Sequence, residues 1–210
     1  NAMRIKCQEL IEQRIQEFEH GYAFTAMDFL DLADAETANK VLSRLSESGA
    51  IRRIIKGVYD RPYYSQIIKE VSDPYIGSVA MALARKFNWT IGPTGETALN
   101  ELHVSTQITN HFVYISDGPY RKYEIGSYVL EFRHCANREV SGKSHITITV
   151  IQAIKAIGRD SITQKDISIL SAVLRDEDKQ TIIRESRNST EWVHRILKEV
   201  CHVNEEGSST

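Results

Sequence analysis

Long apolar runs, clustered cysteines and a strong net charge are all missing from this chain of 210 residues. No stretch approaches the ~18 consecutive apolar residues of a membrane-spanning helix, and no basic-then-apolar leader is present. The three cysteines, Cys7, Cys135 and Cys201, lie far apart, which argues against a disulfide framework or a CxxC metal clip. We therefore expect a cytoplasmic protein that does not associate with membranes.

Sequence motifs of catalysis are equally scarce. No GxSxG elbow and no HExxH pair occurs. His134 and Cys135 are adjacent on a predicted strand, so their side chains point to opposite faces and favour no shared metal. The segment 141–144, Ser-Gly-Lys-Ser, resembles the end of a phosphate-binding P-loop, but Asn137 stands where that motif requires glycine. We expect no enzymatic activity, no cofactor and no metal. A weaker alternative is a nucleic-acid-processing enzyme that binds nucleotide through segment 141–144.

Charge is unevenly distributed along the first sixty residues. The whole chain holds 26 basic and 28 acidic residues, for a net charge of −2. Acidic residues predominate from Arg4 to Glu36, whereas basic residues predominate from Lys40 to Arg61, where only Glu47 and Asp60 oppose them. A basic stretch in a near-neutral protein indicates a local surface for an anionic partner.

The order of predicted elements in this region is three helices followed by a hairpin. Apolar spacing predicts a helix over Arg4–Glu19. Thr25 and Asp28 form a capping-box pattern that opens a short helix over Ala26–Leu32. Asp34 can cap a third helix, and Ile51–Tyr59 is typical of a hairpin. This order predicts a winged helix-turn-helix DNA-binding domain over residues 4–62.

In such a domain the third helix enters the major groove and the wing contacts the DNA backbone. With Val41 and Leu45 buried, the opposite helix face and the wing supply the candidate DNA-binding residues. These are Thr37, Lys40, Ser43, Arg44, Arg52, Arg53 and Lys56. Imperfect alternation in the hairpin leaves open which arginine faces outward.

The rest of the chain predicts a mixed α/β domain that ends in helices. A linker over 63–73 precedes a helix that starts at Asp73-Pro74 and runs to about Asn88. The predicted domain covers 74–203, and residues 204–210 are predicted to be a disordered tail. Its remaining predicted elements are a helix over 96–102, strands over 111–115 and 127–133, a segment 146–157 left open between strand and helix, and helices over 163–174 and 192–200. The whole chain is therefore expected to be α+β.

One run is more specific than any of these patterns. Residues 98–107, Ala-Leu-Asn-Glu-Leu-His-Val-Ser-Thr-Gln, are followed by Tyr-Ile-Ser-Asp-Gly-Pro at 114–119, and the wing region 46–62 precedes them. Together with 153–158 and Trp192, these segments resemble the AbiEi-type antitoxins over residues 5–200. His103 is a departure, because glycine is common at this position in that family; it argues against a left-handed backbone at this turn, although histidine tolerates that region better than β-branched residues do.

The resemblance implies an antitoxin that also represses its own operon. Its N-terminal domain would bind operator DNA. Its C-terminal domain would neutralise a cognate toxin, commonly nucleotidyltransferase-like, without requiring a stable direct complex. Arg121, Lys122 and Arg133 are candidate toxin-neutralising residues because they cluster near the hairpin over 114–133. The alternative is a protein-interaction module that has a winged-helix fold and does not bind DNA.

Overall fold

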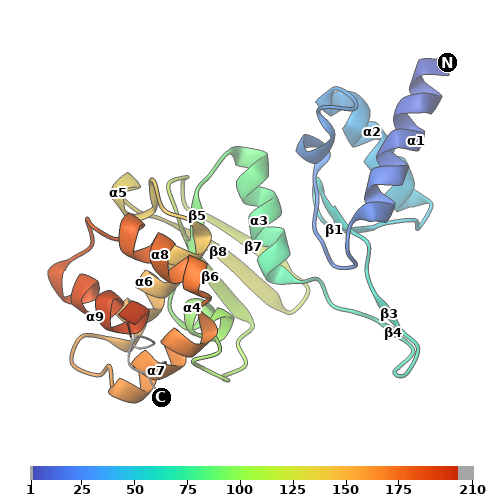
Figure 1. Cartoon of the computed structure of the whole chain (residues 1–210). Helices are drawn as coiled ribbons and strands as arrows, with labels where there is room; N and C mark the ends of the chain where they lie inside the picture. The colour runs from blue at the N-terminus through green and yellow to red at the C-terminus, as the bar shows by residue number, and fades with distance from the viewer. Residues whose placement is uncertain (1, 203–210) are drawn as a thin grey trace. The chain divides into compact units, whose positions relative to one another are not determined.

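The fold is α+β, as the computed structural model shows for residues 2–202 (Figure 1). The predicted tail over 204–210 lies outside the described residues. Contacts divide the chain into two compact units, one ending at Trp89 and the other beginning at Thr90. The sequence instead predicts a linker over 63–73 as the divide, so the helix after that linker belongs to the first unit.

The first unit begins with three helical segments and a hairpin. They are α1 (Ala2–Glu17), the 3₁₀ helix η1 (Ala26–Phe29), α2 (Ala35–Glu47), and the antiparallel strands β1 (Arg52–Ile55) and β2 (Val58–Asp60). Figure 1 shows α1 and α2 as the two long helices of this part. Their shared core contains Ile11, Ile15, Phe24, Phe29, Val41 and Leu42.

Side-chain caps fix where these helices begin. The predicted capping box at Thr25 and Asp28 is confirmed, and the Asp34 side chain accepts from the Thr37 backbone N–H at 2.8 Å. The second helix is shorter than predicted, because η1 is a single 3₁₀ turn that ends at Phe29. Caps are local hydrogen bonds, so the sequence determines helix starts better than helix lengths.

A backbone bridge ties the hairpin to the segment before η1. The Phe24 N–H donates to the Tyr59 carbonyl at 2.8 Å, and the Tyr59 N–H donates to the Phe24 carbonyl at 2.9 Å. Both side chains are buried in the core. Gly57, with φ of +78°, provides the left-handed turn that reverses the chain between β1 and β2.

The predicted linker contains a second hairpin. Strands β3 (Tyr64–Ser65) and β4 (Glu70–Val71) pair antiparallel, and α3 (Ile76–Phe87) follows. The helix begins two residues after the predicted Asp73-Pro74 start, with Tyr75 at its N-cap. Asn88, in the left-handed region at φ of +55°, ends it as predicted.

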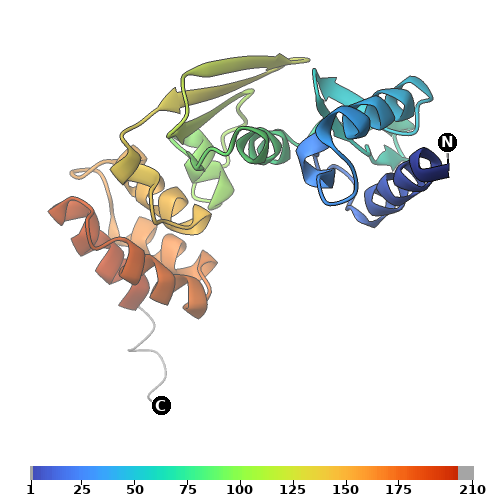
Figure 2. The same ribbon diagram turned by 90° about the horizontal axis from the view of Figure 1, so that it is seen from above.

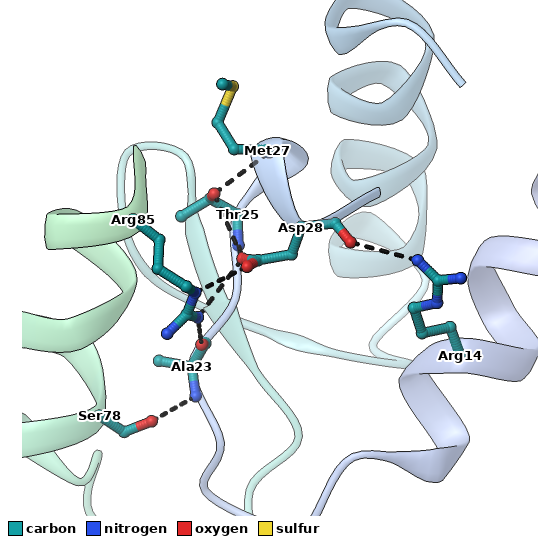
Figure 3. A network of polar contacts seen from close by, with 7 residues as sticks. All are labelled: Arg14, Ala23, Thr25, Met27, Asp28, Ser78 and Arg85. Carbon is teal, nitrogen blue, oxygen red and sulfur yellow. Dashed lines mark hydrogen bonds and ion pairs between the residues drawn. The ribbon is translucent and has the colours of Figure 1, made fainter. Parts of the chain in front are cut away.

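A polar network joins α3 to η1 (Figure 3). The Arg85 guanidinium donates to Asp28 Oδ1 at 2.7 Å and to the Ala23 carbonyl at 2.9 Å. Ser78 Oγ accepts from the Ala23 N–H at 2.7 Å, and Arg14 donates to the Asp28 carbonyl at 3.4 Å. Asp28 therefore serves both the capping box and an ion pair, and α3 is part of the first unit.

The second unit contains a four-stranded sheet in the order β5-β6-β8-β7. The strands are β5 (Ile91–Pro93), β6 (His111–Ser116), β7 (Arg121–Ile125) and β8 (Tyr128–His134). Strands β6 and β8 are parallel, and the two edge strands are antiparallel to their neighbours. The predicted strands over 111–115 and 127–133 are confirmed; β5 and β7 are not among the predicted elements.

Helices complete this unit. They are α4 (Glu96–Glu101), α5 (Asn137–Val140), α6 (His145–Ile157), α7 (Gln164–Val173), α8 (Asp176–Glu185) and α9 (Glu191–His202). Helix α6 contacts β5 and also α4, α8 and α9, so it lies between the sheet and the C-terminal helices (Figure 2). Among the described helices, none combines the length and apolar character needed to cross a bilayer.

Two backbone features position α4 and α6. A Cβ added at Gly92 would lie 2.1 Å from Ile148 Cγ2, so only glycine lets β5 approach α6 this closely. After α4, His103 adopts φ of +57°, so the turn is left-handed even though its residue is not glycine. The Gly92–Gly95 segment thus contains the end of β5 and the entry to α4.

Candidate nucleic-acid interface

Helix α2 presents one apolar and one polar face. Ala38, Val41, Leu42 and Leu45 are buried at helical spacing, whereas Thr37, Lys40, Ser43 and Arg44 lie outside the buried stripe. All four predicted groove-contacting side chains are therefore on the polar side of one helix, as the periodicity predicts.

Thr37 is occupied by the helix cap. Its hydroxyl donates to Asp34 Oδ2 at 3.0 Å, next to the backbone cap bond from the same residue. These hydrogen bonds, from the Thr37 backbone first and its side chain second, lower the pKa of the Asp34 carboxyl. The Thr37 side chain therefore stabilises the start of α2.

Acidic residues accompany the rest of this polar face. Lys40 forms an ion pair with Glu36, and the Ser43 hydroxyl donates to Glu47 Oε1 at 3.1 Å. Arg44 is exposed, and its side chain makes no ion pair with any residue between 2 and 202. Of the two cations on this face, Lys40 is paired with Glu36, whereas Arg44 has no ion-pair partner in the described part of the chain.

Arg52 is held inside the unit. Its guanidinium donates to both carboxylate oxygens of Asp60, at 2.9 Å from Nε and 2.6 Å from Nη2. Its Nη1 also donates to the Ser72 carbonyl at 2.6 Å. Asp60 is fully buried, and a buried carboxylate needs such a partner. The structure thus gives Arg52 a role in holding the hairpin and the Ser72 segment together.

Arg53 and Lys56 differ from Arg52. Both are exposed on the hairpin, and within the described chain neither side chain is paired with a carboxylate. A Cβ at Gly57 would lie 3.0 Å from Lys86 Nζ, so the amine of Lys86 lies beside the hairpin turn. Sequence reasoning missed Lys86, because α3 was assigned to a different domain.

The first unit therefore carries cations on several neighbouring elements. Helix α2 leads into β1 through a short turn, in which the Ala50 and Ile51 N–H groups donate to the Leu45 carbonyl. Arg44 lies in the last turn of α2, and Arg53 lies near the start of β1. Lys56 and Lys86 add positive charge at the other end of the hairpin.

Of the candidate toxin-neutralising residues in the second unit, two lie on the edge strand β7 and Arg133 lies on the neighbouring inner strand β8. Arg121 and Lys122 are exposed on β7, and Lys122 is opposite Glu131 of β8. Arg133 Nε donates to Glu131 Oε1 at 2.8 Å, and His111 Nε2 lies 2.6 Å from Glu131 Oε2. The Arg133 hydrogen bond is the main reason that the pKa of Glu131 is lowered, although burial opposes it.

The P-loop-like segment has a structural function. Ser144 is the residue before the first turn of α6. Glu185 of α8 accepts from the Ser144 N–H at 2.8 Å, from the Ser144 hydroxyl at 2.7 Å and from Thr147 Oγ1 at 2.6 Å. Burial opposes ionisation of Glu185, but these hydrogen bonds together lower its pKa. Segment 141–144 is therefore a helix entry stabilised by a carboxylate.

His134 and Cys135 are also separate in the structure. His134 Nδ1 lies 2.9 Å from the Gly118 carbonyl, and burial raises the pKa of the Cys135 thiol. Over residues 2–202 no group of three His, Cys, Asp or Glu side chains has an arrangement that could hold a metal ion.

Comparison with known proteins gives one match. The model of the family of unknown function DUF6088 matches residues 10–182. No curated protein and no solved structure matches the chain. The resemblance to AbiEi-type antitoxins stays a prediction. Because the family model covers most of its length, the chain belongs to DUF6088.

Proposed function

We propose that the first unit is a winged helix-turn-helix that binds duplex DNA, with α2 as the recognition helix and the β1–β2 hairpin as the wing. The observation that carries this proposal is the position of the unpaired cations. Arg44 lies on α2, and Arg53 and Lys56 lie on the hairpin, the two elements that contact DNA in such domains.

The proposed contacts fall into two groups. Arg44 reaches a phosphate or a guanine edge from α2, and Arg53 and Lys56 reach backbone phosphates from the wing, with Lys86 beside them. Arg52 sets the position of the wing through Asp60. Lys40 can exchange its exposed Glu36 partner for a phosphate, because an exposed helical ion pair contributes only about 0.3–0.5 kcal/mol.

The biological role that we propose is an antitoxin that represses its own operon. It rests on the resemblance of residues 5–200 to AbiEi-type antitoxins. In this proposal the first unit binds operator DNA and the second unit neutralises a cognate toxin. Arg121, Lys122 and Arg133 remain the candidate residues for neutralisation.

Binding to a fragment from upstream of the gene tests the DNA contacts. We expect Arg44→Ala, Arg53→Ala and Lys56→Ala together to weaken binding and to flatten the dependence of log K on log[salt] by about 0.9 for each lost phosphate contact. A matched control removes two exposed cations of the second unit, Arg159→Ala with Lys165→Ala. The proposal fails if the triple variant and the control bind alike, or if the wild-type chain does not bind DNA.

A protein-interaction module is the second candidate, and the surface of α1 favours it. Glu9, Glu17 and Glu19 are exposed on or just after this helix and could contact a basic partner surface. Charge reversal of these three residues should abolish partner binding if this candidate is right. Under the DNA-binding proposal it should leave operator binding intact or strengthen it, because the reversal removes repulsion from phosphates.

A further inference from the structure

The second unit contains a cavity beside α8 and α9 that no DNA-binding role requires. Its volume is about 650 Å³, within the range of roughly 300–1,000 Å³ that is typical of small-molecule sites. Asp176, Gln180 and Ile183 line it from α8, and Cys201 lines it from α9.

A buried lysine without a close partner lines the same cavity. Lys179 is only 5% exposed, and its Nζ makes no hydrogen bond to any residue that the structure describes. Among residues 2–202, the carboxylate oxygen that lies within 4 Å of this amine is Asp176 Oδ1, 3.9 Å away, on a side chain that is 88% exposed. An amine with three donors is costly to bury unless an acceptor is supplied.

The neighbouring thiol does not supply that acceptor. Burial raises the pKa of Cys201 to about 11, even though Lys179 opposes the rise. Cys201 is therefore a neutral thiol at physiological pH, and it contributes apolar surface to the cavity rather than a negative charge.

Further cations surround the opening. Arg184, in the last turn of α8, and Arg187, two residues after that helix, also line the cavity, are exposed, and make no ion pair with the described residues. His202 lines the cavity from the end of α9. Basic groups thus outnumber the single acidic group, Asp176, around a space that is large enough for an organic molecule.

We propose that this cavity binds a small phosphate-bearing molecule, with the phosphate held by the guanidinium groups of Arg184 and Arg187 and by Lys179, whose Nζ is buried in this structure and turns toward the phosphate on binding. Arginine matches phosphate oxygens through paired N–H donors, and a buried lysine adds a point charge. Ile183 and the Cys201 thiol contact the organic part. This site is independent of the proposed DNA interface.

Thermal unfolding and calorimetric titration of the full chain test the site, with inorganic phosphate, adenosine monophosphate and adenosine as probes at constant ionic strength. We expect both phosphate compounds to bind and to raise the unfolding temperature, and adenosine to do neither. Tighter binding of the monophosphate would identify an organic phosphate as the preferred ligand. Lys179→Met should weaken phosphate binding at least tenfold, whereas Lys165→Met, on exposed surface elsewhere, should not change it.

Lys179→Met is also informative without ligand. Methionine fills a similar volume with no charge, so the variant should unfold at the same temperature as the wild type or higher. Arg187→Gln, at the exposed opening, provides a second variant that leaves the buried packing intact and should weaken phosphate binding severalfold. The proposal is overturned if neither phosphate compound binds, or if Lys179→Met and Arg187→Gln bind phosphate as tightly as Lys165→Met.

Discussion

The two units treat a buried charge in opposite ways. In the first, the fully buried Asp60 has both carboxylate oxygens bonded to Arg52. In the second, the amine of Lys179 is buried with no bonded partner among the described residues. A charge whose partner comes from the same unit contributes to architecture, whereas a charge without one indicates where an external group can bind. The difference separates Arg52 from the cations that we assign to binding.

The largest effect should come from breaking the paired charge. Asp60→Ala leaves Arg52 with no carboxylate in a partly buried position, and we expect a loss of about 3–5 kcal/mol in the free energy of unfolding. Chemical denaturation followed by circular dichroism measures it. The control is Arg53→Ala, at the exposed position next to Arg52. It should change the free energy of unfolding by less than about 0.5 kcal/mol. Equal effects of the two substitutions would remove the structural role of the Arg52–Asp60 pair.

A second charged group sharpens the comparison within the second unit. Glu185 accepts three hydrogen bonds at the start of α6, so Glu185→Ala should cost about 1.5–3 kcal/mol. Because the pKa of Glu185 is lower in the folded state, its contribution is complete above the unfolded value of about 4.3 and is lost as the pH falls through the folded pKa. Denaturation of both proteins across pH 2–7 should show the difference disappearing in acid. A stability difference between the wild type and Glu185→Ala that does not change with pH would contradict this role of the Glu185 carboxylate.

Breaking the polar network in Figure 3 should have an intermediate effect on the free energy of unfolding. Asp28→Ala removes one half of the capping box and the ion pair with Arg85. We expect a loss of about 1–2 kcal/mol, with faster amide exchange in α3 than in α2. Asp31→Ala is the control, since its pair with Arg14 is at an exposed position. If the control costs as much as Asp28→Ala, the network does not hold α3.

The smallest effect should be at the exposed pair of α2. Lys40→Ala should change the free energy of unfolding by about 0.3–0.5 kcal/mol, because the Glu36 pair is exposed on one helix face. If Lys40 contacts DNA as proposed, the same variant should lower the free energy of DNA binding by more than it lowers the free energy of unfolding. Chemical denaturation and a DNA-binding titration on the same preparation measure these two free-energy changes. A variant that changes stability but not binding would remove Lys40 from the interface.

Local signals in the sequence determined much of the fold. Thr25 and Asp28 form the predicted capping box, and Thr163 and Asp166 form another at the start of the helix predicted over 163–174. Such caps can be predicted because they need only residues three apart. Segment 146–157 stayed ambiguous, since its apolar residues fit a buried strand or a buried helix. The structure makes it part of α6, with every residue from Thr147 to Ile154 buried.

Two of the elements that the sequence did not predict, β7 and α8, begin without apolar periodicity. Strand β7 begins with Arg121 and Lys122, and α8 begins with Asp176, Glu177 and Asp178, so neither shows the pattern of a buried face. Each is held by neighbours distant in sequence: β7 by β8, and α8 by α6 and α9.

The candidate sites show the same limit. The sequence identifies Arg52 and Arg53 as equivalent cations of one hairpin. Only the fold shows that Arg52 pairs with Asp60 and Ser72 while Arg53 stays exposed. The burial of Lys179 is also invisible in sequence, where it lies within a run of acidic and polar residues.

The backbone bridge between Phe24 and Tyr59 has a consequence for binding kinetics and affinity. Two hydrogen bonds of 2.8 and 2.9 Å fix the hairpin to the extended segment that precedes η1. These bonds are already formed before any ligand binds. Immobilising the backbone of a flexible loop costs about 1–2 kcal/mol for each residue. Here folding has already ordered these residues, so less of the free energy of the ligand contacts is spent on ordering the hairpin and more remains as affinity. Association with a ligand also needs no slow rearrangement of the hairpin.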